Sequence, residues 1–152
     1  EFDYVMQVNV FGCFYMLRAV SRVMCQQGIG SIVNISSIWS DISAKGVLAY
    51  CASKGAVSQL TRSAALDLAG SGVRVNEIRP GETNTPMLAS ERGDNFSKGQ
   101  IQEKLEEIAK TIPVGRLADP EEIADAALFL LSKQSAYMTG SHITVDGGYT
   151  AR

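Results

Sequence analysis

The chain has 152 residues, of which 45% are hydrophobic and 20% are charged, and its formal net charge is −2. Such a length and composition are typical of one globular domain with a sizeable core. The near-neutral charge gives no basic surface that would attract nucleic acid or an anionic membrane, and no apolar run approaches a membrane span of roughly 18 residues, so we expect neither partner. The three cysteines, Cys13, Cys25 and Cys51, have neither metal nor redox spacing, which favours reduced thiols in a cytoplasmic protein.

The first elements along the chain are a helix and a strand. From Glu1 to about Gln27 apolar residues recur at helical spacing, and the glycines at 28 and 30 end the helix. We expect its packing face to contain Val8, Gly12, Tyr15, Met16, Ala19, Val23 and Met24. Ser31 to Ile35 then forms a short apolar strand, of the kind found in parallel sheets that are covered on both faces.

A second helix and strand follow. The helix runs from Ala49 to about Leu68, Ser71-Gly72 ends it, and Val73 to Ile78 forms the next strand. A strand, a crossover helix and a strand predict a parallel sheet. Ligands of such open sheets bind beyond the carboxyl ends of the strands, which is where Ser37 and Pro80-Gly81 fall.

The rest of the chain contains a polar stretch, a helix and a strand. Met87 to Ile112 is polar and ends in an amphipathic helix, as expected of a lid over a substrate. Asp119-Pro120-Glu121-Glu122 predicts a helix start with Asp119 as N-cap and a capping box closed by Glu122. His142 to Val145 forms a last strand, in which we expect His142 to pack rather than to act as a catalyst or a metal ligand.

The chemistry of the chain centres on Tyr50 and Lys54. Residues four apart on a helix are neighbours on one face, so the phenol and the ammonium lie close together. A positive charge beside a phenol lowers its pKa from the ordinary value of about 10, toward the range in which acid–base catalysis is efficient. With a hydroxyl donor at Ser37, the set suits the movement of a proton to or from an alcohol oxygen.

With its surroundings, this set resembles the short-chain dehydrogenase/reductase family along nearly the whole chain. The matching stretches are V-N-V-F-G around Asn9, G-S-I-V-N-I-S-S, Y-C-A-S-K, R-V-N-E-I-R-P-G, T-P-M and V-D-G-G. The resemblance implies an α/β fold with a doubly wound, Rossmann-like parallel sheet. It also implies an oxidoreductase that interconverts an alcohol and a ketone with NAD or NADP.

The resemblance assigns a role to each matching residue. Tyr50 matches the general acid/base, and Lys54 matches the lysine that lowers the tyrosine pKa and holds the nicotinamide ribose. Ser37 matches the serine that hydrogen-bonds the substrate oxygen, with Ser36 as a weaker candidate, and Asn9 matches the asparagine that anchors a water in the proton relay. The residues that would contact the cofactor are Tyr50, Lys54, Pro80, Gly81, Thr83 and Thr85.

Two residues near the implied cofactor loop depart from the family pattern. Glu77 and Glu82 occupy places that are usually small or apolar, and a buried carboxylate is costly unless it is paired. We expect Glu82 to face the pocket, whereas the sequence offers no explanation for Glu77.

The glycine-rich turn T-G-x-x-x-G-x-G and the N-N-A-G motif of the family do not occur in this sequence. We therefore expect residues 1–152 to be the C-terminal part of one NAD(P)-binding domain. The resemblance also implies a homodimer or homotetramer that packs through the first helix and the tyrosine-bearing helix. The alternative is a truncated, non-catalytic interaction subunit. A Ser-Lys hydrolase that uses Ser53 or Ser37 is disfavoured, because the sequence shows no nucleophile elbow.

Overall fold

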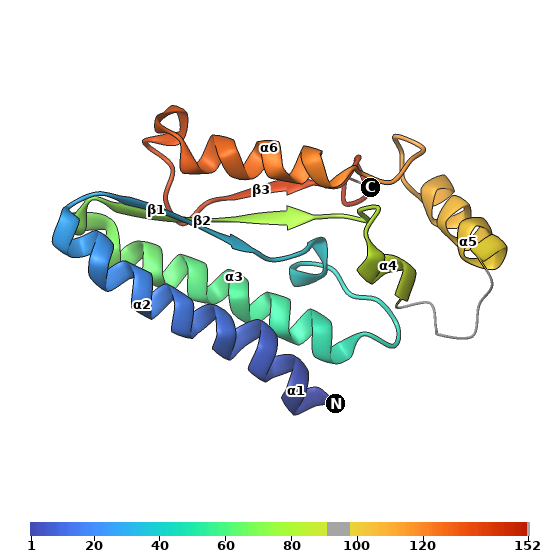
Figure 1. Ribbon diagram of the computed structural model, residues 1–152, viewed down its shortest axis with the longest axis horizontal. Helices are drawn as coiled ribbons and strands as arrows, with labels where there is room; N and C mark the ends of the chain where they lie inside the picture. The colour runs from blue at the N-terminus through green and yellow to red at the C-terminus, as the bar shows by residue number, and fades with distance from the viewer. Residues whose placement is uncertain (91–97, 152) are drawn as a thin grey trace.

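The computed structural model describes residues 1–90 and 98–151, and within these ranges it contains a parallel sheet of three strands in the order β1-β2-β3. The strands are β1 (Gly30–Ile35), β2 (Val73–Pro80) and β3 (His142–Val145). The α-helices are α1 (Phe2–Met6), α2 (Gly12–Gln27), α3 (Leu48–Leu68), α4 (Pro86–Ser90), α5 (Lys98–Thr111) and α6 (Pro120–Leu131). Helices α2 and α3 cover one face of the sheet and α6 covers the other, which confirms the expected α/β class (Figure 1).

The first helix is continuous from Phe2 to Gln27 and has a π-helical turn, η1 (Gln7–Phe11), in its middle. It ends at Gly28, whose positive φ of 68° closes the last turn as the sequence predicted. The predicted packing face is mostly wrong, because Val8, Tyr15, Met16 and Val23 are exposed. The buried face instead carries Val10, Leu17, Val20, Met24 and Cys25. Apolar residues occur on both sides of this helix, so their spacing did not single out one face.

The same segment, Phe2–Gln27, is long and apolar enough to meet a length-and-hydropathy criterion for a membrane span. The expectation that no apolar run approaches such a span is therefore wrong. In the structure its inner face belongs to the core: Leu17 packs with Ile32 of β1 and Val75 of β2. The segment is therefore a packing helix of the sheet in this fold.

The unit β1-α3-β2 positions the carboxyl ends of two strands side by side. The two strands pair from Gly30↔Val73 to Ile35↔Ile78. Strand β2 runs two residues further than predicted, and the Gly81 N–H donates to Val145 O over 2.9 Å. A Cβ at residue 81 would lie 2.8 Å from Asp146 Cα, so this close approach requires glycine.

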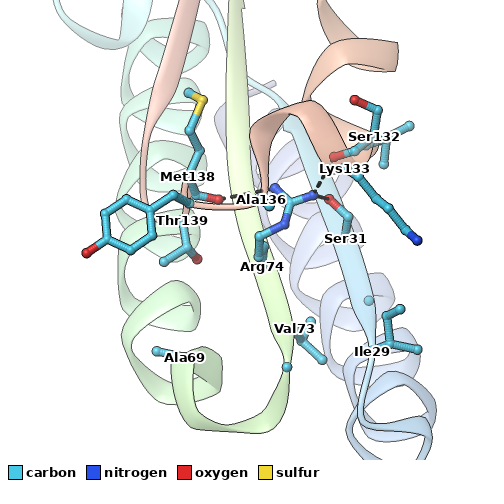
Figure 2. A pocket seen from close by; sticks show the side chains of 14 residues that line it. Ile29, Ser31, Ala69, Val73, Arg74, Ser132, Lys133, Ala136, Met138 and Thr139 are labelled. Atoms are coloured by element: carbon cyan, nitrogen blue, oxygen red, sulfur yellow. Dashed lines mark hydrogen bonds between the residues drawn. The ribbon is translucent and has the colours of Figure 1, made fainter.

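Alternate residues of β2 face opposite sides of the sheet. Val73 and Val75 belong to the core beneath the sheet with Ala65 of α3, and Glu77 and Arg79 continue on that face. Arg74 faces the other side, where it donates to the carbonyl of Leu130 at the end of α6. It lines a depression of about 760 Å³ at the amino ends of β1 and β2 (Figure 2).

The C-terminal elements follow the sequence closely, with one exception. The capping box of α6 is present, and Glu122 accepts a hydrogen bond from the Asp119 N–H over 2.9 Å. Strand β3 has the predicted bounds, but His142 is exposed, so the expectation that it packs is wrong. Of the predicted lid, residues 91–97 lie outside the described residues, and α4 and α5 flank them.

Candidate active site

Ser37 lies two residues after the end of β1, at the carboxyl edge of the sheet. It is buried and is the N-cap of a 3-10 turn, η2 (Ile38–Ser40), in which its Oγ accepts a hydrogen bond from the Trp39 N–H over 3.2 Å. Ser40 Oγ in turn donates to Ser37 O over 2.7 Å. The backbone around this hydroxyl is therefore held by a turn that is hydrogen-bonded within itself.

Tyr50 and Lys54 lie on the first turns of α3, and the structure brings them together as the helical spacing predicted. Lys54 Nζ lies 5.5 Å from the centroid of the Tyr50 ring. The same nitrogen donates to Ile35 O, the last residue of β1, over 2.9 Å. The ammonium is thus fixed between the tyrosine and the strand that leads to Ser37.

Burial dominates the electrostatics of Lys54. It lowers the pKa of the ammonium from its ordinary value, and the electrostatic interaction with Cys13 opposes this shift. Burial also raises the pKa of the Cys13 thiol, against the effect of Lys54. Cys13 Sγ donates to Asn34 Oδ1 over 3.5 Å, so it behaves as a packed thiol near the lysine rather than as a nucleophile. Cys25 and Cys51 are also free and half-buried.

Asn9 lies in the π-helical turn and is linked to the tyrosine-bearing helix through Ser53, a residue for which the sequence predicted no such role. Its Nδ2 donates to Ser53 Oγ over 3.0 Å, and Ser53 Oγ donates to Tyr50 O over 2.8 Å. A serine three residues after a helical residue commonly bonds back to its carbonyl, so the Y-C-A-S-K spacing contained this signal. The chain Asn9–Ser53–Tyr50 ties the first helix to the start of α3.

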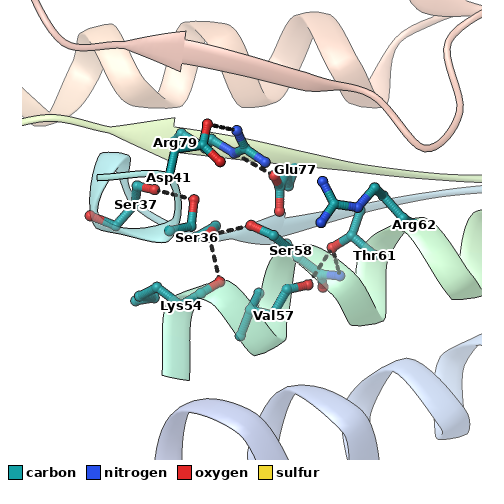
Figure 3. Close-up of polar contacts among 12 residues, drawn as sticks. Ser36, Ser37, Asp41, Lys54, Val57, Ser58, Thr61, Arg62, Glu77 and Arg79 are labelled. Atoms are coloured by element: carbon teal, nitrogen blue, oxygen red, sulfur yellow. Dashed lines mark hydrogen bonds and ion pairs between the residues drawn. The ribbon is translucent and has the colours of Figure 1, made fainter. Parts of the chain in front are cut away.

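Ser36 faces a different neighbourhood from Ser37 (Figure 3). Its hydroxyl donates to Lys54 O over 3.1 Å and shares a hydrogen bond of 3.0 Å with Ser58 Oγ. Both partners belong to α3, so Ser36 joins the strand to the helix. This geometry supports the preference for Ser37 as the serine of the site.

The predicted cofactor loop begins at the same edge. Thr83 Oγ1 donates to Gly81 O over 3.1 Å, and Thr83 also pairs with Ala118 in an isolated β-bridge. Thr85 Oγ1 accepts from the Leu88 N–H over 3.4 Å at the start of α4. Glu82 lines a cavity of about 120 Å³ together with Val145 and Asp146. Neither Tyr50 nor Lys54 lines this cavity, so the expectation that Glu82 faces the pocket of the site stays a prediction. The loop from Pro80 thus leaves β2 at the edge of the sheet where β1 leads to Ser37.

Glu77, which the sequence left without explanation, has a partner. Arg79 Nε donates to Glu77 Oε1 over 2.6 Å, and Arg79 Nη1 forms an ion pair with Asp41, just after η2 (Figure 3). Nothing in the sequence indicated that Asp41 belongs to this cluster, because Asp41 lies in a loop whose position depends on the pairing of β1 with β2.

Comparisons with known proteins agree with this arrangement. The family described as "Enoyl-(Acyl carrier protein) reductase" matches residues 1–150. The galactitol 2-dehydrogenase (L-tagatose-forming) of Cereibacter sphaeroides is 45% identical over 148 residues, which is 96% of this chain and 56% of that protein.

Two solved structures show the same fold. A ligand-free aldohexose dehydrogenase of Thermoplasma acidophilum matches with a TM-score of 0.94 and 35% identity, over 100% of this chain and 60% of that one. A gluconate 5-dehydrogenase of Burkholderia cenocepacia, in complex with NADP and tartrate, matches with a TM-score of 0.88 and 32% identity, over 99% of this chain and 56% of that one. The chain therefore spans a little more than half the length of these relatives, and it belongs to the short-chain dehydrogenase/reductase family.

Proposed function

We propose that the protein containing this chain is an oxidoreductase that interconverts an alcohol and a ketone with NAD(H) or NADP(H). The observation that carries the proposal is the position of Lys54. Its Nζ lies 5.5 Å from the Tyr50 ring centroid and is held by the carbonyl of Ile35, two residues before Ser37. With the Tyr50 phenol, the Lys54 ammonium and the Ser37 hydroxyl at the carboxyl edge of the sheet, the charge that develops on one substrate oxygen can be stabilised there.

Each residue has a distinct task in this proposal. In alcohol oxidation the Tyr50 phenolate accepts the hydroxyl proton, and in ketone reduction the phenol returns it. Lys54 stabilises the phenolate, and Ser37 Oγ donates to the substrate oxygen. Lys54 and the loop from Pro80 would hold the nicotinamide, which would supply the hydride chemistry when bound. Asn9 holds the start of α3 through Ser53 and anchors a water of the proton relay.

The residues present fit a nicotinamide cofactor. An ammonium has three N–H donors, and the bond from Lys54 to Ile35 O uses one of them, so others can bond ribose hydroxyls. The loop of Pro80, Gly81, Thr83 and Thr85 follows β2 at the edge where open α/β sheets bind dinucleotides. The similar gluconate 5-dehydrogenase was solved with NADP, which supports this assignment.

Two further features of the proposal concern the substrate and the assembly. Similarity to galactitol, aldohexose and gluconate dehydrogenases makes small polyols and sugars the first substrates to test. We also propose a homodimer or homotetramer formed through the first helix and α3. Exposed apolar side chains on these helices support it: Phe11, Tyr15, Met16, Leu48 and Leu66.

The test is a comparison of two tyrosine variants in the full-length gene product, assayed with a panel of polyols and sugars and both cofactors. Tyr50→Phe should lower kcat by at least about 100-fold, since a positioned acid–base group contributes that much, and weaken cofactor binding far less, because Lys54 and the loop from Pro80 remain. Tyr137→Phe is the matched control, because Tyr137 is fully exposed on the opposite edge of the sheet. A folded, cofactor-binding protein that oxidises or reduces nothing in the panel would favour the interaction-subunit alternative.

A further inference from the structure

Two charged side chains are buried next to each other on β2, on the face toward α3. Glu77 is 3% exposed and Arg79 is 2% exposed. The Arg79 Nε donates to Glu77 Oε1 over 2.6 Å. Burial of charged groups is unfavourable unless they are paired and hydrogen-bonded, and even a good pair seldom adds net stability. The pair therefore points to a role other than stabilising the core.

The guanidinium of Arg79 is divided between two carboxylates. A guanidinium that serves one carboxylate commonly binds both of its oxygens. Here one nitrogen binds Glu77 and another binds Asp41, while Glu77 Oε2 is buried without a hydrogen-bond partner among the described residues (Figure 3). Arg79 thus leaves Glu77 half-satisfied in order to reach Asp41, which makes it a bridge rather than a simple counter-ion.

Asp41 is the far end of the turn that begins at Ser37. The Ser40 N–H donates to Ser37 O over 3.1 Å, and the Asp41 N–H donates to Ile38 O over 3.1 Å. The Ser37 hydroxyl itself accepts from the Trp39 N–H. Because these hydrogen bonds connect the two ends of the turn, a displacement of Asp41 also displaces Ser37. Arg79 therefore fastens the serine-bearing turn to the neighbouring strand.

We propose that Asp41 and Arg79 are positioning residues for Ser37, and that Glu77 orients Arg79 for this task. The inference rests on the proposed function, in which Ser37 donates to the substrate oxygen. Displacement of a catalytic group by about 1 Å can lower the rate by about 100-fold. A salt bridge that fixes the turn thus acts on the rate without touching the substrate.

Asp41→Ala in the full-length gene product is the cleanest test. The Asp41 side chain is 58% exposed, so its removal leaves the buried Glu77–Arg79 pair intact. We expect kcat to fall by about tenfold, with KM and cofactor affinity changed by less than about twofold. Asp41→Asn retains an acceptor oxygen and should recover part of the rate. Asp125→Ala, an exposed aspartate on α6, is the matched control and should keep the rate of the unmodified protein.

A double-variant cycle shows whether Asp41 acts through Ser37. When Ser37→Ala is already present, adding Asp41→Ala should lower kcat no further, because the positioned hydroxyl is gone. An undiminished tenfold loss in that background overturns the proposal. An unchanged kcat in Asp41→Ala alone overturns it as well.

Amide hydrogen exchange separates this inference from the proposed function. Exchange at residues 38–41 should accelerate in Asp41→Ala and stay unchanged in Asp125→Ala, whether or not a substrate is known. If the unmodified protein has no activity but the exchange at the turn accelerates, the proposed function fails and the fastening of the turn stands. Unchanged exchange in Asp41→Ala overturns the inference on its own.

Discussion

The two arginines of β2 show how differently the two edges of the sheet use the same side chain. Arg74, near the amino edge, donates over 3.0 to 3.2 Å to neutral oxygens, its only acceptors among the described residues: Ser31 Oγ, Ser135 Oγ and the carbonyls of Leu130, Ser132 and Met138. Arg79, at the carboxyl edge, binds two carboxylates, one buried and one exposed. Arg74 joins the end of α6 to the sheet, while Arg79 joins the turn that begins at Ser37 to β2.

The edges also differ in how well their polar groups are satisfied. Arg74 lines an open depression in which water can replace any bond that is lost (Figure 2). At the carboxyl edge Glu77 Oε2 has no hydrogen-bond partner in the part of the chain that the structure describes, and burial lowers the pKa of Lys54. Proteins tolerate unfavourable polar burial mainly where function requires it. This contrast supports the proposed site at the carboxyl edge, although the larger of the two depressions lies at the amino edge.

Arg79→Met should have the largest effect on stability. It leaves Glu77 buried without its counter-ion, and breaking a buried pair in this way costs about 3–5 kcal/mol. Urea unfolding of the variant and the unmodified protein measures the difference in the free energy of unfolding. The double variant Glu77→Ala/Arg79→Ala removes both charges and should be closer in stability to the unmodified protein, yet remain slow because Asp41 is no longer fastened.

If the single and the double variant lose the same stability, then the loss comes from packing and the two charges are not coupled. If the double variant regains the full rate, the salt bridge to Asp41 has no positioning role. The pair of variants thus separates stability from catalysis at the carboxyl edge.

Much of the site was predictable because it depends on short spacings. Tyr50 and Lys54 are one helical turn apart, and Ser37 follows an apolar strand, so their shared edge follows from the strand–helix–strand order. The Glu77–Arg79 contact could also have been predicted, since residues two apart on a strand share a face. What the spacing did not show was that this face is buried and that Asp41 stands opposite it.

Other parts depend on packing that no local pattern determines. The outer side of the first helix is nearly as apolar as its inner side. The apolar spacing therefore predicts that Tyr15 and Met16 pack in the core, although both are exposed. The π-helical turn around Asn9 and the link through Ser53 arise from the contact between the first helix and α3. Local propensity carries little information about such contacts.

Arg74→Met should have a moderate effect. It removes hydrogen bonds to neutral acceptors that water can partly replace, so we expect a loss of about 1–3 kcal/mol in the free energy of unfolding. The kcat per folded molecule should stay unchanged, because Arg74 is far from Ser37 and Tyr50 along the strands. A fall in kcat that matches the effect of Asp41→Ala would show that the two edges are not functionally distinct.

The exposed ion pair between Arg116 and Glu122 should have the smallest effect. The side-chain hydrogen bond from Arg116, followed by the backbone bond from Asp119, lowers the pKa of Glu122 from 4.5 to about 2. A carboxylate whose pKa is depressed by folding contributes stability above its unfolded value, and the contribution is lost as the pH falls from 4.5 through about 2. Solvent screens an exposed pair, so the contribution is small.

Glu122→Gln tests this with little change in shape, since glutamine can still accept the Asp119 N–H in a capping box. We expect thermal unfolding at neutral pH to shift less than in Arg74→Met, and the decline in stability between pH 4.5 and about 2 to become shallower. A destabilisation as large as that of Arg79→Met would mean that burial does not decide what an ion pair contributes here. The contrast between the two arginines of β2 would then need another cause.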